Sequence, residues 1–143
     1  QKLSSLQTAR GPFRRTVIAR TTTEAAPDAV WDVLTDFFGD RERNPLLRSV
    51  QGRPHVESML TIQVFSIASS PVRSQAQVTV VKAGRDLRWV GCRIASGLLD
   101  EEHRFALRQS GNATVVQHTR QFTGILVPFA GALLAQTEFA SPP

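Results

Sequence analysis

Two histidines and an arginine near the end of the chain have side chains that could move or hold a proton. His103, His118 and Arg120 lie in two strand-like runs on either side of Gly111 and Asn112. Glycine followed by asparagine suits a two-residue hairpin loop between alternating runs. The sequence therefore predicts a β-hairpin whose register is fixed by this loop.

That register decides which side chains share a face, because side chains alternate along a strand. One face then carries three cross-strand pairs: His103 with Arg120, Phe105 with His118, and Leu107 with Val116. The other face carries Glu102, Arg104, Arg108, Gln117, Thr119 and Gln121 and is expected to face water. A face built for packing alone would not contain two histidines and an arginine. An apolar cavity for a ligand commonly contains a few such groups.

These three polar side chains suit acid–base chemistry. A histidine titrates near ~6.5 in water, so it can take up or give a proton at neutral pH. Arg120, the expected neighbour of His103, could bind an oxyanion and would favour the neutral imidazole. Duller alternatives stay open: His103 and Arg120 could bind only backbone or water, and His118, one step deeper, could be a structural histidine.

Metal and cofactor chemistry find little support in the sequence. Glu101 shares the predicted face of His103 and His118, but the spacing of the three fits no recognised zinc motif. The chain has no Gly-rich phosphate loop, no dinucleotide fingerprint and no nucleophile elbow. We therefore expect neither a metal nor a cofactor.

Composition indicates one globular domain. The chain has 143 residues, of which 41% are hydrophobic, and no run reaches the ~18 apolar residues of a membrane span. The single cysteine excludes an internal disulfide. The net charge is +5, but the arginines are scattered and tyrosine is absent, so we expect a basic surface and not a nucleic-acid site. We expect a cytoplasmic protein, either a monomer or a homodimer, and the start at Gln1 indicates processing.

The remaining patterns predict the elements that position the hairpin. Residues 1–12 are expected to form a loose arm, and residues 13–140 a single ligand-binding domain. Pro27 and Asp28 suit the first turn of a helix over residues 27–34. Another helix is expected from Pro128 onward, with Phe129, Leu133 and Leu134 on one stripe. Strands are expected over residues 13–22, 46–50, 59–67, 72–80 and 87–94 and in the hairpin. In the fourth of these, alternation places Val72, Ala76, Val78 and Val80 on one face.

The order and motifs of these elements resemble those of the START-like superfamily, also called the SRPBCC or polyketide cyclase/dehydrase-like group. Five groups of residues carry the resemblance: Pro27-x-x-Val30-Trp31-x-Val33-Leu34-x-Asp36-Phe37, Asn44-Pro45-Leu46-Leu47, Leu87-x-Trp89, His103-x-Phe105-x-Leu107, and Thr114-x-x-x-His118-x-x-x-Phe122-x-Gly124-x-Leu126-x-Pro128. The resemblance implies the α+β helix-grip fold, in which a curved antiparallel sheet of about six or seven strands wraps around a C-terminal helix.

The family pattern is broken at two positions. Arg43 stands where a tryptophan is common, and Arg120 stands where an acidic residue is common. A cation on the presumed cavity wall would favour a ligand with a carboxylate, enolate or phenolate. The expected catalytic residues are His103, His118 and Arg120. The expected ligand contacts are Leu87, Trp89, Phe105, Leu107, Val116 and Phe122, with ordinary core packing as the alternative for Leu87. Trp31 is expected to anchor the first helix to the sheet.

Superfamily members differ widely in activity, so the resemblance leaves several functions open. One hypothesis is an enzyme that folds a polyketide-like substrate in the cavity and promotes its cyclisation, dehydration or rearrangement by confinement and proton transfer. Another is a carrier or sensor that binds a small hydrophobic ligand without changing it. A protein that acts through its surface alone is disfavoured by the polar residues on the apolar face.

Overall fold

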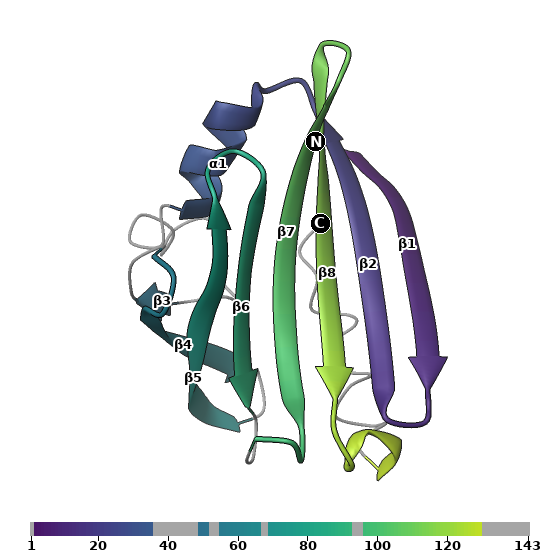
Figure 1. Ribbon diagram of the computed structural model, residues 1–143, viewed down its shortest axis with the longest axis vertical. Helices are drawn as coiled ribbons and strands as arrows, with labels where there is room; N and C mark the ends of the chain where they lie inside the picture. The colour runs from purple at the N-terminus through teal and green to yellow at the C-terminus, as the bar shows by residue number, and fades with distance from the viewer. Residues whose placement is uncertain (1, 36–48, 52–54, 67–68, 93–95, 130–143) are drawn as a thin grey trace.

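A computed structural model describes residues 2–35, 49–51, 55–66, 69–92 and 96–129 (Figure 1). Within these residues, eight strands form one antiparallel sheet in the order β1-β2-β8-β7-β6-β5-β4-β3. The strand bounds are β1 Lys2–Gly11, β2 Arg14–Thr23, β3 Ser49–Gln51, β4 Met59–Ser66, β5 Ser69–Lys82, β6 Asp86–Cys92, β7 Asp100–Ser110 and β8 Ala113–Thr123. Helix α1 (Pro27–Thr35) lies beside β5 and β6 at one end of the sheet (Figure 1).

The predicted hairpin is confirmed with its register. Strands β7 and β8 pair from Asp100 with Thr123 to Ser110 with Ala113, which leaves Gly111 and Asn112 as the loop. Gly111 has a φ of 61°, in the left-handed region that glycine enters without strain. A glycine of this kind is required at the first position of a type II′ loop.

The loose arm predicted for residues 1–12 is wrong. Residues Lys2–Gly11 form β1, which pairs along its length with β2 and makes the sheet eight strands wide. The polar composition misled because this strand lies at the edge of the sheet. On an edge strand, side chains remain in contact with water at positions where a central strand would bury them. Leu6 on β1 is 55% exposed.

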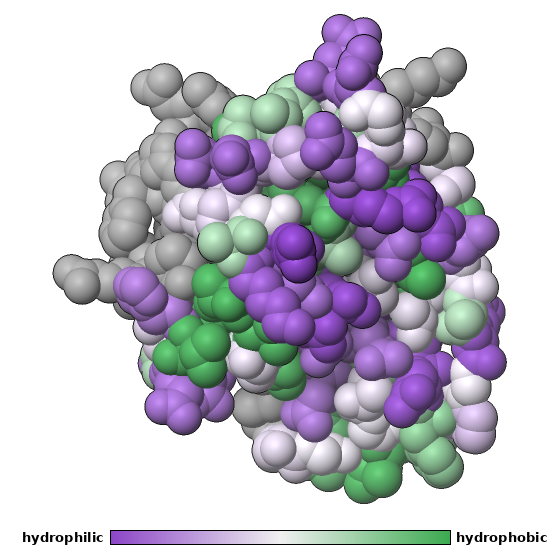
Figure 2. Space-filling view, turned by 45° about the horizontal axis from the view of Figure 1, so that its top comes forward, coloured by the Kyte–Doolittle hydropathy of each residue, from purple (hydrophilic) through white to green (hydrophobic). Residues whose placement is uncertain are grey.

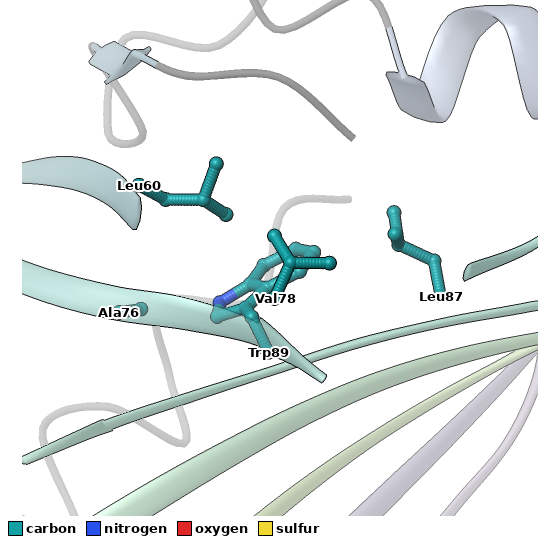
Figure 3. Close-up of a cluster of buried hydrophobic side chains, with 5 residues drawn as sticks. All are labelled: Leu60, Ala76, Val78, Leu87 and Trp89. Carbon is teal, nitrogen blue, oxygen red and sulfur yellow. The ribbon is translucent and has the colours of Figure 1, made fainter. Parts of the chain in front are cut away.

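A compact apolar cluster forms the core on one face of the sheet, here called the inner face. Its buried members come from β4, β5 and β6: Leu60, Ala76, Val78, Leu87 and Trp89 (Figure 3). Trp31 of α1 packs against this cluster, as predicted for an anchor between helix and sheet. The outer face is the opposite side.

Val80 does not share the face of Val78 that strict alternation along β5 predicts for it, and its neighbour takes that place. The pairing of β5 with β6 shifts register between Val78 and Val80. Beyond the shift, Val81 pairs with Leu87 and packs against the cluster, so Val81 takes the place that strict alternation gave to Val80. A β-bulge adds one residue to a strand and therefore reverses which side chains face the core.

A smaller apolar cluster closes the end of the sheet near the turn of β1 and β2. Leu99, Phe122 and Val127 are buried there, and η1 (Val127–Phe129) is a single 3₁₀ turn. The helix predicted from Pro128 onward otherwise lies outside the described residues.

Figure 2 shows one face of the molecule. On this face the hydrophobic residues form separate patches among hydrophilic ones. No helix in the described part of the chain is long and apolar enough to cross a membrane.

Candidate functional site

Four polar side chains meet on the inner face, beside the core cluster. Glu101 and His103 come from β7, and His118 and Arg120 come from β8. His103 pairs in register with Arg120 and, on its other side, with Trp89 of the core cluster. The sequence-predicted trio of His103, His118 and Arg120 is therefore brought together as expected, and Glu101 is the addition.

The two histidines contact each other directly. Nδ1 of His103 lies 3.1 Å from Nε2 of His118, within hydrogen-bond distance. One of these nitrogens must donate and the other accept, because two imidazole nitrogens bind only when a single proton lies between them. The pair is thus a path along which a proton can move from one ring to the other.

Glu101 joins the other end of this pair to Arg120. Its Oε1 lies 2.7 Å from Nε2 of His103 and 2.8 Å from Nη2 of Arg120. Nε of Arg120 also donates to the same oxygen over 3.3 Å. Alternation predicts the correct face for Glu101, but the sequence suggests no role for it there other than that of a metal ligand. The signal available was alternation, since Glu101 and His103 are two residues apart on one strand.

These contacts assign different roles to the two histidines. His103 uses both ring nitrogens within the site, one toward Glu101 and one toward His118. His118 uses only Nε2, and among the described residues no hydrogen bond of its Nδ1 is found. Of the two bases that the sequence offered, His118 is therefore the one with a nitrogen left for a ligand.

Aromatic rings enclose the histidine pair on both sides. Phe105 stacks on His118 with ring centroids 4.2 Å apart and planes inclined by 7°. Trp89 stacks on His103 with centroids 5.3 Å apart and planes inclined by 19°. The four rings form a continuous stack across β6, β7 and β8. Such stacks hold imidazoles in one orientation and exclude water from them.

The surroundings keep His118 neutral. Burial, reinforced by the nearby positive charge of Arg120 and the neighbouring His103, lowers the pKa of His118 from 6.5 to about 3. The carboxylate of Glu101 opposes this shift but does not cancel it. At neutral pH the Nδ1 side of His118 is therefore uncharged and can accept a proton or a hydrogen bond.

The positive charge of Arg120 is already balanced within the site. Its guanidinium binds the Glu101 carboxylate and lies 5.6 Å from the centroid of the Phe122 ring. The side chains of both partners of the ion pair are nearly buried, at 13% and 11% exposed. The expectation that Arg120 favours an anionic ligand is weakened, because Glu101 offsets the charge that would attract one.

The predicted ligand contacts divide into two groups. Leu87 and Phe122 are at most 1% exposed and belong to the two apolar clusters, so both pack in the core. Trp89 and Phe105 lie against the histidine rings, while Leu107 and Val116 pair one step further toward the hairpin loop. Arg43 lies outside the described residues. Within those described, no group of three or more His, Cys, Asp or Glu side chains has an arrangement that could hold a metal ion.

The fold recurs in solved structures of very different sequence. No family model and no curated protein matches the sequence. CalU16 from Micromonospora echinospora superimposes with a TM-score of 0.62 at 18% identity, over 99% of this chain and 88% of that one. Ara h 8.0201 superimposes with a TM-score of 0.61 at 9% identity, over 78% of each chain.

A two-domain protein also contains this fold. The di-domain ARO/CYC StfQ from the steffimycin biosynthetic pathway superimposes with a TM-score of 0.70 at 10% identity, over 90% of this chain. This chain spans 48% of the length of StfQ. The likeness to these structures agrees with the motifs in the sequence, and the chain therefore has the START-like (SRPBCC) fold.

Proposed function

We propose that this protein binds a small hydrophobic or aromatic molecule on the inner face and promotes its cyclisation or dehydration by proton transfer. The observation that carries the proposal is the hydrogen-bonded pair of His103 and His118, which lies among aromatic rings. A neutral base in an apolar setting is suited to removing a proton from a carbon next to a carbonyl group.

Binding would use the aromatic side chains beside the pair. Trp89 and Phe105 offer ring faces and edges to a flat ligand, and Leu107 and Val116 extend the apolar strip toward the loop. Such contacts hold a flexible polycarbonyl chain in one folded conformer. Confinement of this kind converts part of the entropy of binding into a lower barrier.

The proposed reaction is an intramolecular aldol condensation. Nδ1 of His118 takes a proton from the carbon next to one carbonyl, and the C–H electron pair forms an enolate. The enolate carbon attacks a second carbonyl in the same molecule, which closes the ring and leaves an alkoxide. The alkoxide recovers the proton, and loss of a water molecule then gives the enone. No external oxidant or reductant is needed.

The names of the structural neighbours support this choice of chemistry. StfQ is described as an ARO/CYC protein of a biosynthetic pathway, and it shares the fold at low sequence identity. Fold alone does not determine activity. The residues beside the histidine pair are therefore the stronger support.

A simple diketone tests the proposal. Heptane-2,6-dione closes to 3-methylcyclohex-2-enone and water, and the product enone absorbs in the ultraviolet; we expect His118→Phe to slow this at least about 100-fold. Phenylalanine can keep the stacking on Phe105 but has no nitrogen. Thr119→Ala, on the outer face of the same strand, should leave the rate unchanged. Equal rates in wild type and His118→Phe would contradict a role for His118 as the base.

A carrier or sensor is the second candidate, and the Glu101–Arg120 ion pair favours it. A guanidinium held by a carboxylate is less able to stabilise a developing enolate. In this case 2-naphthol, a neutral bicyclic probe, should quench tryptophan fluorescence while the diketone remains unchanged. His118→Phe should then weaken naphthol binding by about 1–3 kcal/mol, the range for a lost buried hydrogen bond.

A further inference from the structure

We infer that Glu101 is a positioning residue: it holds the proton of His103 on Nε2 and so makes the histidine pair a relay that ends at Nδ1 of His118. The inference rests on the proposed function, in which His118 is the base that meets the ligand. It adds a residue that the sequence did not assign to catalysis. It also gives His103 a task other than contact with the ligand.

The geometry fixes the order of the relay. Glu101 is a carboxylate that lies 2.7 Å from Nε2 of His103, and an ionised carboxylate can only accept. Nε2 of His103 therefore carries a hydrogen. In the neutral ring Nδ1 of His103 must then accept, and the donor that faces it at 3.1 Å is Nε2 of His118.

This assignment leaves Nδ1 of His118 without a hydrogen, so that a lone pair is available for a ligand. When Nδ1 of His118 gains a proton from the substrate carbon, the Nε2 hydrogen of His118 moves to Nδ1 of His103. His103 becomes an imidazolium whose two hydrogens point to Glu101 and back to His118. The reverse movement returns the proton to the product alkoxide, and both rings regain their starting state.

The charges around the pair place the mobile positive charge on His103. Glu101 is in direct contact with His103 but not with His118, so it stabilises a cation on His103 more strongly. Arg120 of β8 opposes any cation on His118. Arg15 of β2, in register with Phe122, adds another positive charge to the inner face. The acids of α1, Asp28 and Asp32, are exposed.

The relay also removes a difficulty of the proposed mechanism. With a pKa of about 3, His118 alone would hold a proton too weakly to be an efficient base at neutral pH. When the proton passes on to His103, the Glu101 carboxylate stabilises the resulting positive charge, so the proton is held more strongly. The arrangement needs Glu101 to be ionised, and the two hydrogen bonds from Arg120 favour its ionised form.

Nitrogen NMR of the wild-type protein tests the order without any ligand. With ¹⁵N-labelled histidine at neutral pH, we expect both rings to carry their hydrogen on Nε2, with Nδ1 of each unprotonated. On acidification His103 should gain the proton before His118. A neutral His118 with its hydrogen on Nδ1, or uptake of the first proton by His118, would overturn the inference even if diketone turnover is found.

Glu101→Gln tests the charge, because glutamine keeps an acceptor oxygen but has no negative charge. We expect proton uptake by His103 to move to lower pH by at least about one unit, which is tenfold weaker proton binding. Glu102→Gln changes the adjacent residue, which lies on the outer face, and should leave the pH of proton uptake by His103 unchanged. An unchanged titration of His103 in folded Glu101→Gln would also overturn the inference. Where that variant does not fold, the wild-type spectrum decides.

The two proposals can fail separately. Absence of turnover and of naphthol binding with the expected NMR pattern would reject the proposed function and retain the relay geometry. Turnover that depends on His118 but survives in Glu101→Gln, together with an unchanged His103 titration, would retain the function and reject the role of Glu101. The NMR and kinetic measurements therefore report on different claims.

Discussion

His103 and His118 come from neighbouring strands, 15 positions apart in the chain, and their rings hydrogen-bond over 3.1 Å while both stack on other aromatic rings. A histidine pair of this kind is held by packing and not by water. Its protonation is therefore coupled to folding, and the stability of the protein should report on it.

Acidification should destabilise the protein through His118. Its pKa is about 3 in the folded chain, against 6.5 as the ordinary value. Well above pH ~6.5 the ring is neutral in both states and contributes nothing to the pH dependence. Below this value the unfolded chain gains a proton that the folded chain refuses, so stability falls by up to about 1.4 kcal/mol per pH unit.

Urea unfolding at about pH 7.5 and about pH 5 measures this effect. His118→Phe should lose less stability between the two conditions than wild type, because phenylalanine does not titrate. His55→Phe, a change at an exposed histidine, provides the control and should keep the wild-type dependence. Parallel losses in wild type and His118→Phe would show that His118 is not the titrating group.

Asp86 should stabilise the outer face through two arginines. Its carboxylate accepts from Arg88 over 2.8 Å and from Arg104 over 3.1 Å. Burial raises the pKa of Asp86, but the bonds from Arg88 and Arg104 together lower it below 3.8. The stabilisation is thus present above pH 3.8 and lost as the pH falls below it.

Asp86→Asn should therefore lower the free energy of unfolding by about 1–3 kcal/mol at neutral pH, since both arginines lose their charged partner. Thermal melts measure the loss. Glu24→Gln, at an exposed carboxylate just after β2, should change the melting temperature little. Equal melting temperatures for the two variants would mean that the arginine contacts add nothing to stability.

Leu87→Ala should be costly because Leu87 is fully buried in the core cluster, at 0% exposed. Removing its branched end leaves a cavity beside Trp89, and such changes cost about 2–5 kcal/mol. Leu6→Ala on β1 deletes the same atoms from a side chain that is 55% exposed and should cost less than about 1 kcal/mol. Chemical denaturation of both variants tests the difference, which should vanish if the cluster is loosely packed.

Gly124→Ala should be among the most damaging single changes. Gly124 has a φ of 132°, and an added Cβ would overlap the backbone carbonyl of Leu98. Neither group can move without breaking the bond from the Leu126 amide to that carbonyl. Gly97→Ala is the matched change, because Gly97 has a φ of 82° but open space around its Cβ position. Soluble yield and melting temperature should fall much further for Gly124→Ala than for Gly97→Ala.

The hairpin and its shared face could be predicted because both depend on local rules. A glycine–asparagine loop and strict alternation were enough to pair His103 with Arg120 and Phe105 with His118. The loose arm failed because an edge strand and a solvated tail have similar compositions. Alternation did not predict that Val81 packs against the core in place of Val80. The cause is a bulge, which depends on the neighbouring strand and is not visible in the alternation of one segment.

The chemistry of the site was less predictable than its position. Alternation places Glu101, His103 and His118 on one face, but it does not say which side chains touch. Whether Arg120 meets a ligand or a carboxylate depends on diagonal contacts between strands and on rotamers. Those are set by the packing of Trp89 and Phe105 around the pair, a tertiary property.

The two-residue loop at Gly111 and Asn112 has an importance that its distance from the histidines conceals. Surface loops ordinarily tolerate changes of length. Here the length of the loop sets the register of β7 with β8. Loss of one loop residue would either force a bulge or move every side chain of one strand to the opposite face of the sheet. In the second case one histidine would face water and the other the core. A related protein with a loop of different length could thus lack the site even though it keeps Glu101, His103, His118 and Arg120.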